Sequence, residues 1–237
     1  MKLIATCSGK GGAGKSCVAA YTGAALAKAG KKTLLVELDS QTRSLELILG
    51  IKNAAFGALD ALAGDCEAEQ TILEAEGQPG LFFVPAGDGL LPEGEGPLGS
   101  LLTKLGDGYD FVIVDGADLS RLPIGLCNTF LLVITPDTLS VRAGTNLARR
   151  LYRAGAREVR LVINNVPPQI IPIDGANDFD DVIDQIGAQL IEVIPTSPKL
   201  AFAANNALPL DDCSLTVKIF ENLAARLMGQ RRPLLIR

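Results

Sequence analysis

The sequence SGKGGAGKS (residues 8–16) satisfies two nucleotide-binding patterns at once. Gly9, Gly11 and Gly14 fit G-x-G-x-x-G, the phosphate turn of dinucleotide-binding folds, whereas residues 9–16 fit G-x-x-x-x-G-K-[ST], the P-loop of nucleoside triphosphatases. Both patterns require a strand before the loop and a helix after it. The apolar run 3–8 and the helical pattern 15–28 supply them, so either interpretation predicts an α/β fold.

Two lysines and a distant carboxylate favour the P-loop interpretation. Lys10 and Lys15 add positive charge to a loop whose backbone N–H groups already favour anions, which suits a triphosphate. Ser16 offers a hydroxyl to Mg²⁺, and Asp115 ends the run YDFVIVD, where P-loop proteins present a second carboxylate. A strand-end aspartate by itself is more often a helix cap or a loop anchor. With the complete P-loop upstream, we interpret Asp115 as part of a nucleoside triphosphate site.

Short apolar runs alternate with helical patterns along the chain. Continuous apolarity indicates strands buried on both faces, as in a parallel sheet covered by helices. We predict a single doubly wound α/β domain over residues 1–237, with a mostly parallel sheet of about seven or eight strands. The expected helices are 15–28, 138–154, 179–187 and 214–228, and the expected strands are 3–8, 33–38, 81–85, 110–115, 130–135, 160–164 and 190–195.

Two stretches carry neither pattern. Residues 86–99 are rich in Gly and Pro and are predicted to form a surface loop or lid between two strands. Residues 165–178 form a second irregular stretch. Neither has the character of a linker, so we expect no division into smaller domains.

Composition disfavours several classes of site. The chain has no histidine, which removes imidazole as a metal ligand, triad base or pH switch. Its five cysteines form no C-x-x-C, which favours neither a zinc site nor a disulfide framework and indicates a reducing, cytoplasmic setting. We expect neither a signal peptide nor a membrane span, because the apolar runs are too short. The net charge of −5 disfavours nucleic-acid binding in the absence of a local basic patch.

The loop KGGAGKS (residues 10–16) resembles the K-G-G-x-G-K-[ST] loop of the MinD/ParA family of P-loop ATPases, which its extra lysine sets apart. The resemblance covers nearly the whole chain and is closest to the MinD branch. Residues 31–50 are similar to the second strand and switch region of that branch, and residues 135–151 to its P-x-x-x-S-V-R segment. Residues 192–210 match the late I-P…A-x-N-x-x-x-P stretch of the family.

This resemblance implies a site for ATP or ADP with Mg²⁺. Lys15 would contact the terminal phosphates, Asp39 would position the attacking water, and Asn164 would meet the edge of the adenine. Asp115 would reach Mg²⁺ directly or through water. The implied catalytic residues are Lys10, Lys15 and Asp39. The implied nucleotide-binding residues are Gly11, Gly12, Ala13, Gly14, Lys15, Ser16, Cys17 and Asn164, and the implied metal site is Ser16, Asp39 and Asp115.

The resemblance also implies an ATP-dependent homodimer. In the family, the lysine that corresponds to Lys10 extends across a two-fold interface to the nucleotide of the facing subunit. The expected protein is a slow ATPase, stimulated by a protein partner that it positions or regulates, as in division-site selection. It is expected in the cytoplasm, with peripheral contact at the inner face of the membrane left open.

The sequence departs from the family pattern at several places. Glu37 stands where MinD-like proteins usually have Asp, and Cys17 replaces the usual Thr or Ser beside the α-phosphate. Gly116-Ala117-Asp118 replaces the customary Ser/Thr-Pro. Phosphate binding is expected to be intact, whereas hydrolysis and its coupling to partners are expected to be slower or altered.

Other functions stay open at this point. One is an interaction protein in which ATP only stabilises a binding surface, and another is a ParA-like partitioning ATPase. The latter would need basic surfaces such as residues 148–160, which are more simply a solvated helix face. A metallocluster carrier is disfavoured, because burial in the core better explains Cys7 and Cys127.

The C-terminus bears on membrane binding, because MinD proteins end in a basic amphipathic helix. Leu215, Ile219, Leu223 and Leu227 recur at four-residue spacing, which indicates the core face of a last helix. Residues 230–237 remain as a candidate tail with three Arg and a short apolar run. We predict weak or absent membrane association, because so short a patch binds lipid weakly.

Overall fold

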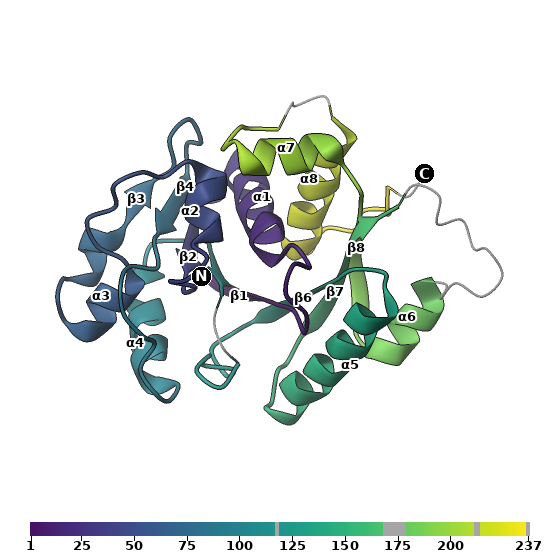
Figure 1. Cartoon of the computed structure of the whole chain (residues 1–237), viewed down its shortest axis with the longest axis horizontal. Helices are drawn as coiled ribbons and strands as arrows, with labels where there is room; N and C mark the ends of the chain where they lie inside the picture. The colour runs from purple at the N-terminus through teal and green to yellow at the C-terminus, as the bar shows by residue number, and fades with distance from the viewer. Residues whose placement is uncertain (117–118, 168–178, 211–213, 236–237) are drawn as a thin grey trace.

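An eight-stranded sheet forms the centre of the chain in the computed structural model, which describes residues 1–116, 119–167, 179–210 and 214–235 (Figure 1). The strand order is β3-β4-β2-β5-β1-β6-β7-β8. All neighbouring strands run parallel except β3 and β4, which are antiparallel. The predicted doubly wound α/β fold is therefore confirmed.

All the strands and helices expected from the sequence form close to their expected bounds, together with shorter elements. The strands are β1 (Lys2–Cys7), β2 (Thr33–Glu37), β3 (Leu73–Glu74), β4 (Leu81–Val84), β5 (Phe111–Asp115), β6 (Thr129–Ile134), β7 (Val159–Val166) and β8 (Gln189–Pro195). The helices are α1 (Lys15–Lys28), α2 (Ser44–Leu49), α3 (Ala58–Ala63), the short η1 (Ala68–Thr71), α4 (Gly96–Leu105), α5 (Thr138–Arg153), α6 (Phe179–Ile186), α7 (Pro198–Asn205) and α8 (Leu215–Leu227).

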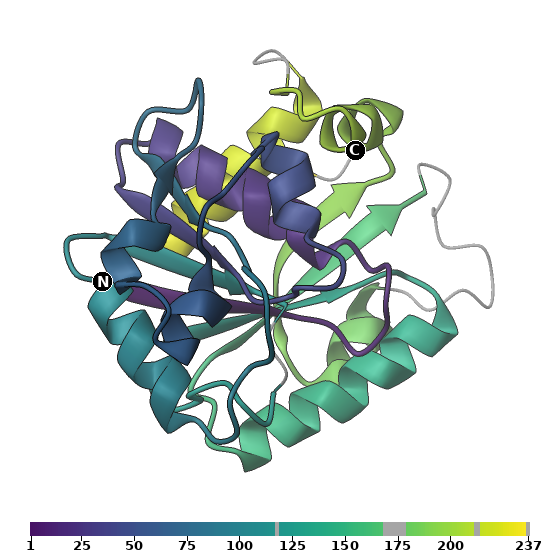
Figure 2. The same cartoon turned by 60° about the vertical axis from the view of Figure 1, so that its left-hand side comes forward.

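Helices cover both faces of the sheet, as Figures 1 and 2 show. One face packs against α1, α2, α7 and α8, and the other against α3, α4, α5 and α6. The central strands β2, β5 and β6 are buried along their whole length. Their side chains therefore contribute to two separate hydrophobic layers, which explains their continuous apolarity.

Helix α4 begins inside the stretch 86–99 that was predicted to be a loop. The loop ends at Glu95, and α4 starts at Gly96 with Pro97 in its first turn. Proline is tolerated there because the first N–H groups of a helix need no partner within it. The helix is stable because four of its leucines, Leu98, Leu101, Leu102 and Leu105, are buried.

Strand β7 also runs two residues into the stretch 165–178 that was predicted to be irregular. It ends at Val166, and residues 168–178 of that stretch lie outside the described residues. The extension follows from pairing, because Val166 lies opposite Pro195 of β8 after a register shift.

The predicted core face of the last helix is confirmed except at its first position. Ile219, Leu223 and Leu227 are almost completely buried between α1 and β8, whereas Leu215 is 50% exposed. Leu215 is the first residue of α8.

Candidate functional site

The candidate site lies where the carboxyl ends of β1, β5 and β2 meet. Because β5 lies between β1 and β2, the loop after β1 comes next to Asp115 and to the segment after Glu37. The backbone N–H of Leu38 donates to the carbonyl oxygen of Asp115 at 2.8 Å, which joins the ends of β2 and β5. Ligand sites of open α/β sheets occur at this edge of the strands.

The loop between β1 and α1 has the backbone of a phosphate loop. Gly12 and Gly14 have φ values of 77° and 90°, in the left-handed region that favours glycine. A Cβ built on Gly11 or Gly12 would have no atom within 4 Å, so this backbone faces open space. A Cβ on Gly9 would lie 2.4 Å from the carbonyl oxygen of Ala143, so the loop packs closely on α5. The geometry therefore lets an anion approach the N–H groups.

Asp115 is held at the base of this loop by two hydroxyl groups. Ser16 Oγ donates to one carboxylate oxygen at 2.5 Å, and Thr6 Oγ1 donates to the other. Burial raises the pKa of Asp115 above its usual range, although the two hydroxyls and the charge of Lys15 act in the opposite direction. A hydroxyl beside a carboxylate is a donor set that suits Mg²⁺, which takes few protein ligands and keeps several waters. These residues therefore fit the ion.

Asp39 lies beside this pair and organises the turn that follows β2. Its carboxylate accepts from the backbone N–H groups of Gln41 and Thr42, both at 3.1 Å, and from the Thr42 hydroxyl at 2.6 Å. Partial burial acts to raise the pKa of Asp39, but these hydrogen bonds and the charge of Lys15 outweigh it and lower that pKa. A Cβ on Gly116 would lie 2.6 Å from the Cβ of Asp39, so Gly116 permits this close approach.

Asn164 also reaches the phosphate loop, from the end of β7. Its Nδ2 donates to the carbonyl oxygen of Ala13 at 2.8 Å. A Cβ on Gly14 would lie 2.3 Å from the same nitrogen. The structure thus brings Asn164 to the loop backbone, a contact that the sequence did not predict.

Lys10 is paired within its own chain. Its Nζ lies 3.0 and 3.2 Å from the carboxylate oxygens of Asp137, and both side chains are almost half exposed. Asp137 caps α5 by accepting from the N–H of Ser140 at 3.0 Å. The hydrogen bond from Thr135 is the main cause that lowers the pKa of Asp137 to about 2, with Ser140 and Lys10 adding to it.

Glu37 lies opposite Asp115 in the sheet and is bound to the start of α2. Its fully buried carboxylate accepts from the N–H groups of Leu45 and Glu46, at 2.8 and 3.2 Å, and so caps α2. Burial raises the pKa of Glu37 to about 7 despite these two hydrogen bonds. The glutamate side chain, which is longer than that of aspartate, therefore serves to bind the start of α2. The sequence did not reveal this structural role.

Sequence reasoning did not identify Thr6, which contacts Asp115, or Asp137, which contacts Lys10. The pattern Asp137-x-x-Ser140 before a helical stretch is a capping signal that could have identified Asp137. Thr6 gives no comparable signal, because it is one residue within an apolar strand. The other implied nucleotide-binding residues lie along the loop and the first turn of α1, where Ala13 is buried and Cys17 is half-buried.

Two of the described cysteines, Cys7 and Cys127, lie in the core. Cys7 and Cys127 are 8% and 2% exposed in one hydrophobic cluster, as predicted, and burial raises the pKa of both thiols to about 12. Within the described ranges, no group of three or more cysteine, aspartate and glutamate side chains is arranged to hold a metal ion. Among the described helices, none combines the length and the apolar character of a bilayer span.

Comparison with known proteins gives consistent results. Residues 4–210 match the model of the CobQ/CobB/MinD/ParA nucleotide binding domain. The chain is 31% identical over 239 residues to a putative septum site-determining protein MinD from Emiliania huxleyi, which covers 97% of this chain and 88% of that relative. It is 29% identical over 244 residues to the septum site-determining protein MinD of Synechocystis sp., with 99% and 92% covered. The MinC:MinD cell division protein complex of Aquifex aeolicus superimposes with a TM-score of 0.88 at 27% identity, covering 99% of this chain and 98% of that chain.

Proposed function

Because the chain belongs to the CobQ/CobB/MinD/ParA nucleotide-binding family, we propose that it is a MinD-like ATPase that binds and hydrolyses ATP with Mg²⁺. It positions or regulates a protein partner in the cytoplasm, as in division-site selection. One observation carries this proposal: the hydroxyl of Ser16, directly after the P-loop lysine, lies 2.5 Å from the buried carboxylate of Asp115. A P-loop with this pair at its base suits a Mg²⁺–nucleoside triphosphate.

The residues of the site have separate roles in phosphoryl transfer to water. The N–H groups of residues 11–17 bind the phosphate oxygens, and Lys15 neutralises charge that develops on the terminal phosphate. Ser16 and Asp115 hold Mg²⁺, which supplies further neutralisation when it is bound. Asp39, whose lowered pKa keeps it ionised at neutral pH, orients the attacking water. Little proton chemistry is needed, which fits a chain without histidine.

Lys10 acts in the dimer. Lys15 already serves the phosphates of its own chain, so Lys10 is proposed to reach the nucleotide of the facing subunit. Its pair with Asp137 is half exposed, and such surface pairs contribute only about 0 to 1 kcal/mol, so Lys10 can leave it at low cost. Without phosphates between the subunits, the two copies of Lys10 would mainly repel each other. Dimerisation therefore depends on ATP.

Light scattering in ATP, in ADP and without nucleotide tests the dimer switch. We expect ATP with Mg²⁺ to convert a monomer to a dimer, and Lys10→Ala to keep nucleotide binding while losing both the dimer and turnover. Lys31→Ala is the matched control, because Lys31 precedes β2 and so lies at the opposite edge of the sheet. A Lys10→Ala protein that dimerises with ATP and hydrolyses it at the parent rate would overturn the assignment of Lys10.

Asp39→Ala in the same assay separates an ATPase from an interaction protein that only binds ATP. We expect this variant to bind ATP and to accumulate as the dimer, while its steady-state hydrolysis disappears. Equal, residual phosphate release by the parent and the variant would instead favour the interaction protein. That alternative is motivated by the unusual residues after Asp115, of which Gly116 touches Asp39 and residues 117–118 lie outside the described part.

A further inference from the structure

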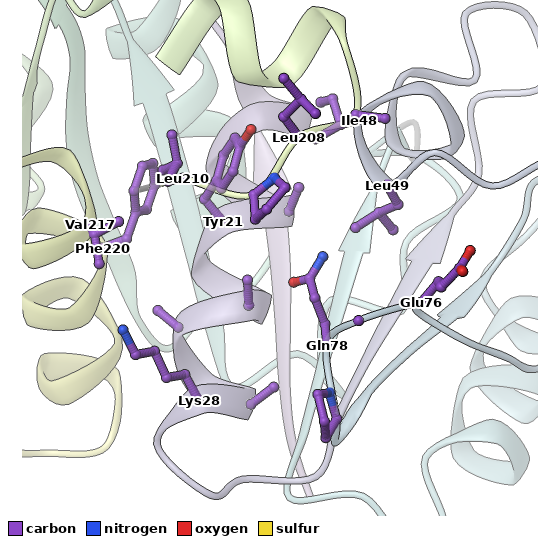
Figure 3. A pocket seen from close by; sticks show the side chains of 18 of the residues that line it. Tyr21, Lys28, Ile48, Leu49, Glu76, Gln78, Leu208, Leu210, Val217 and Phe220 are labelled. Carbon is purple, nitrogen blue, oxygen red and sulfur yellow. The ribbon is translucent and has the colours of Figure 1, made fainter. Parts of the chain in front are cut away.

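A second concave site lies away from the phosphate loop, on the face of α1 turned toward α8. Its walls are the middle and the last turns of α1, the end of α2, the turn between β3 and β4, the segment 207–210 and the first half of α8 (Figure 3). The cavity has a volume of about 610 Å³. That lies within the range of about 300–1,000 Å³ typical of sites for small organic molecules.

Most of the wall is apolar. Ala20 and Ala24 form part of the α1 side, and Leu49, Leu208 and Phe220 face them from three other segments. The alanine side chains on α1 are small, and the larger side chains of Leu49, Leu208 and Phe220 do not fill the space next to them. This unfilled space is the cavity. Such a wall favours the apolar body of a ligand through burial of surface from water.

Tyr21 supplies a polar group that the folded chain does not satisfy. The residue is 92% buried, and within the described part of the chain its hydroxyl has no hydrogen-bond partner. Figure 3 shows its ring among the cavity side chains with the hydroxyl directed toward Leu208. A buried polar group without a partner is unfavourable, and native proteins rarely leave one. Burial raises the pKa of the Tyr21 hydroxyl well above its usual range, so the hydroxyl stays protonated and can donate.

The charges at the rim disfavour an anion. Lys28 and Glu221 lie 3.0 Å apart across the mouth, so their charges compensate each other. Glu76 adds a further negative charge from the turn between β3 and β4. A carboxylate or phosphate in the cavity would meet this charge together with an apolar wall, and would lose its hydration.

We propose that this cavity binds a small uncharged molecule with an apolar body and one hydrogen-bond acceptor, such as a ketone, which accepts from Tyr21 Oη. The site is separate from the phosphate loop and does not depend on the proposed ATPase activity. It nevertheless touches two elements of that activity, since α1 begins at Lys15 and Ser16 and α2 is capped by Glu37.

Three naphthalenes of similar shape test the chemistry on the full chain, with binding followed through the methyl NMR signals of the alanines on α1. The probes are 2-acetylnaphthalene, the hydrocarbon 2-ethylnaphthalene and the anion 2-naphthoate. We expect saturable binding of the ketone, weaker binding of the hydrocarbon and the weakest binding of the anion. Tyr21→Phe keeps the ring and removes the hydroxyl. It should weaken ketone binding roughly three- to tenfold and leave the hydrocarbon unchanged within about twofold.

Filling the cavity gives an independent test. Ala24→Leu places a larger side chain in the space and should weaken both neutral probes by about tenfold or more. Ala201→Leu makes the same change on the exposed surface of α7 and should leave both affinities unchanged. Tyr21→Phe removes an unsatisfied group, so its thermal stability should equal or exceed that of the parent. Failure of the ketone to saturate, equal binding by Ala24→Leu and the parent, or an equal loss for ketone and hydrocarbon in Tyr21→Phe would each overturn the proposal.

Discussion

We propose that the Asn164 side chain serves two neighbours, the phosphate loop and the adenine of the nucleotide. Its amide nitrogen donates to the carbonyl oxygen of Ala13 at 2.8 Å, which leaves the amide oxygen to accept from the exocyclic amine of adenine. Guanine presents an acceptor at the equivalent position and would be disfavoured. The loop contact and the proposed base contact would thus depend on different atoms of the same side chain, and substitutions can separate them.

We therefore expect Asn164→Ala to lose most of the preference for ADP over GDP, by roughly tenfold, because a good polar contact to a base contributes about 1–3 kcal/mol. Asn164→Asp keeps an acceptor oxygen but removes the donor to Ala13. This variant should retain the preference for ADP over GDP. It should bind both nucleotides more weakly, because the phosphate loop loses its hydrogen bond from residue 164. Titration of both nucleotides by calorimetry measures these effects. An unchanged ADP/GDP ratio in Asn164→Ala would assign the residue to the loop alone.

Glu192 on β8 is a buried residue whose ionisation affects the stability of the fold. Its fully buried carboxylate lies 3.3 Å from Arg226 of α8 and accepts from the N–H of Val193 at 3.1 Å. Burial raises the pKa of Glu192 from 4.5 to about 7, against the effects of Val193 and Arg226. The folded state therefore binds more protons than the unfolded state between these pH values. The resulting stabilisation is present at low pH and is lost as the pH rises through about 7.

Glu192→Gln should remove this dependence. Between about pH 5 and pH 7.5, the free energy of unfolding of the parent should fall by on the order of 2 kcal/mol relative to that of the variant. Urea unfolding at a series of pH values measures the difference. A difference that stays constant with pH, or that grows in favour of the parent, would contradict the raised pKa of Glu192.

At the level of elements, the start of α5 combines a helix cap with a charge pair. Asp137 accepts from the N–H of Ser140 and also holds Lys10. Caps of this kind contribute about 1 kcal/mol, whereas half-exposed ion pairs contribute little. We expect Asp137→Ala to lower the free energy of unfolding by about 1 kcal/mol, and Asp137→Asn, which can still cap, to lower it by a few tenths. Urea unfolding of the three proteins decides between the two contributions, since equal losses would assign the stability to the pair with Lys10.

For the whole molecule, the C-terminal tail bears on where the protein resides. The described part of the tail folds back on α8, where Asn222 Nδ2 donates to the carbonyl oxygen of Pro233 at 3.0 Å. Arg226 donates to the carbonyl oxygen of Arg232 at 2.7 Å, and Leu235 packs partly buried against the core. A tail held in this way must first detach before its apolar side chains can enter a lipid surface.

Accordingly, we expect the full chain with ATP to co-sediment only weakly, or not at all, with anionic phospholipid vesicles. Neutral vesicles provide the reference for nonspecific pelleting, and a variant without residues 230–237 provides the matched control. Strong ATP-dependent co-sedimentation of the full chain that disappears in the truncated variant would show that the tail is a membrane anchor.

Local patterns sufficed for the phosphate loop, most of the buried strands, the helices α1, α5, α6 and α8 and the strand-end Asp115, since each is encoded in consecutive residues. The helices α2 and α3 have six residues each, too few turns for their periodicity to stand out. Contacts across the fold required the order and register of the strands. Lys10 is 127 residues from Asp137 along the chain, Asn164 is 151 from Ala13, and Thr6 is 109 from Asp115. The cavity at Tyr21 likewise exists only where α1, α2 and α8 converge, because its walls come from segments that no local pattern relates.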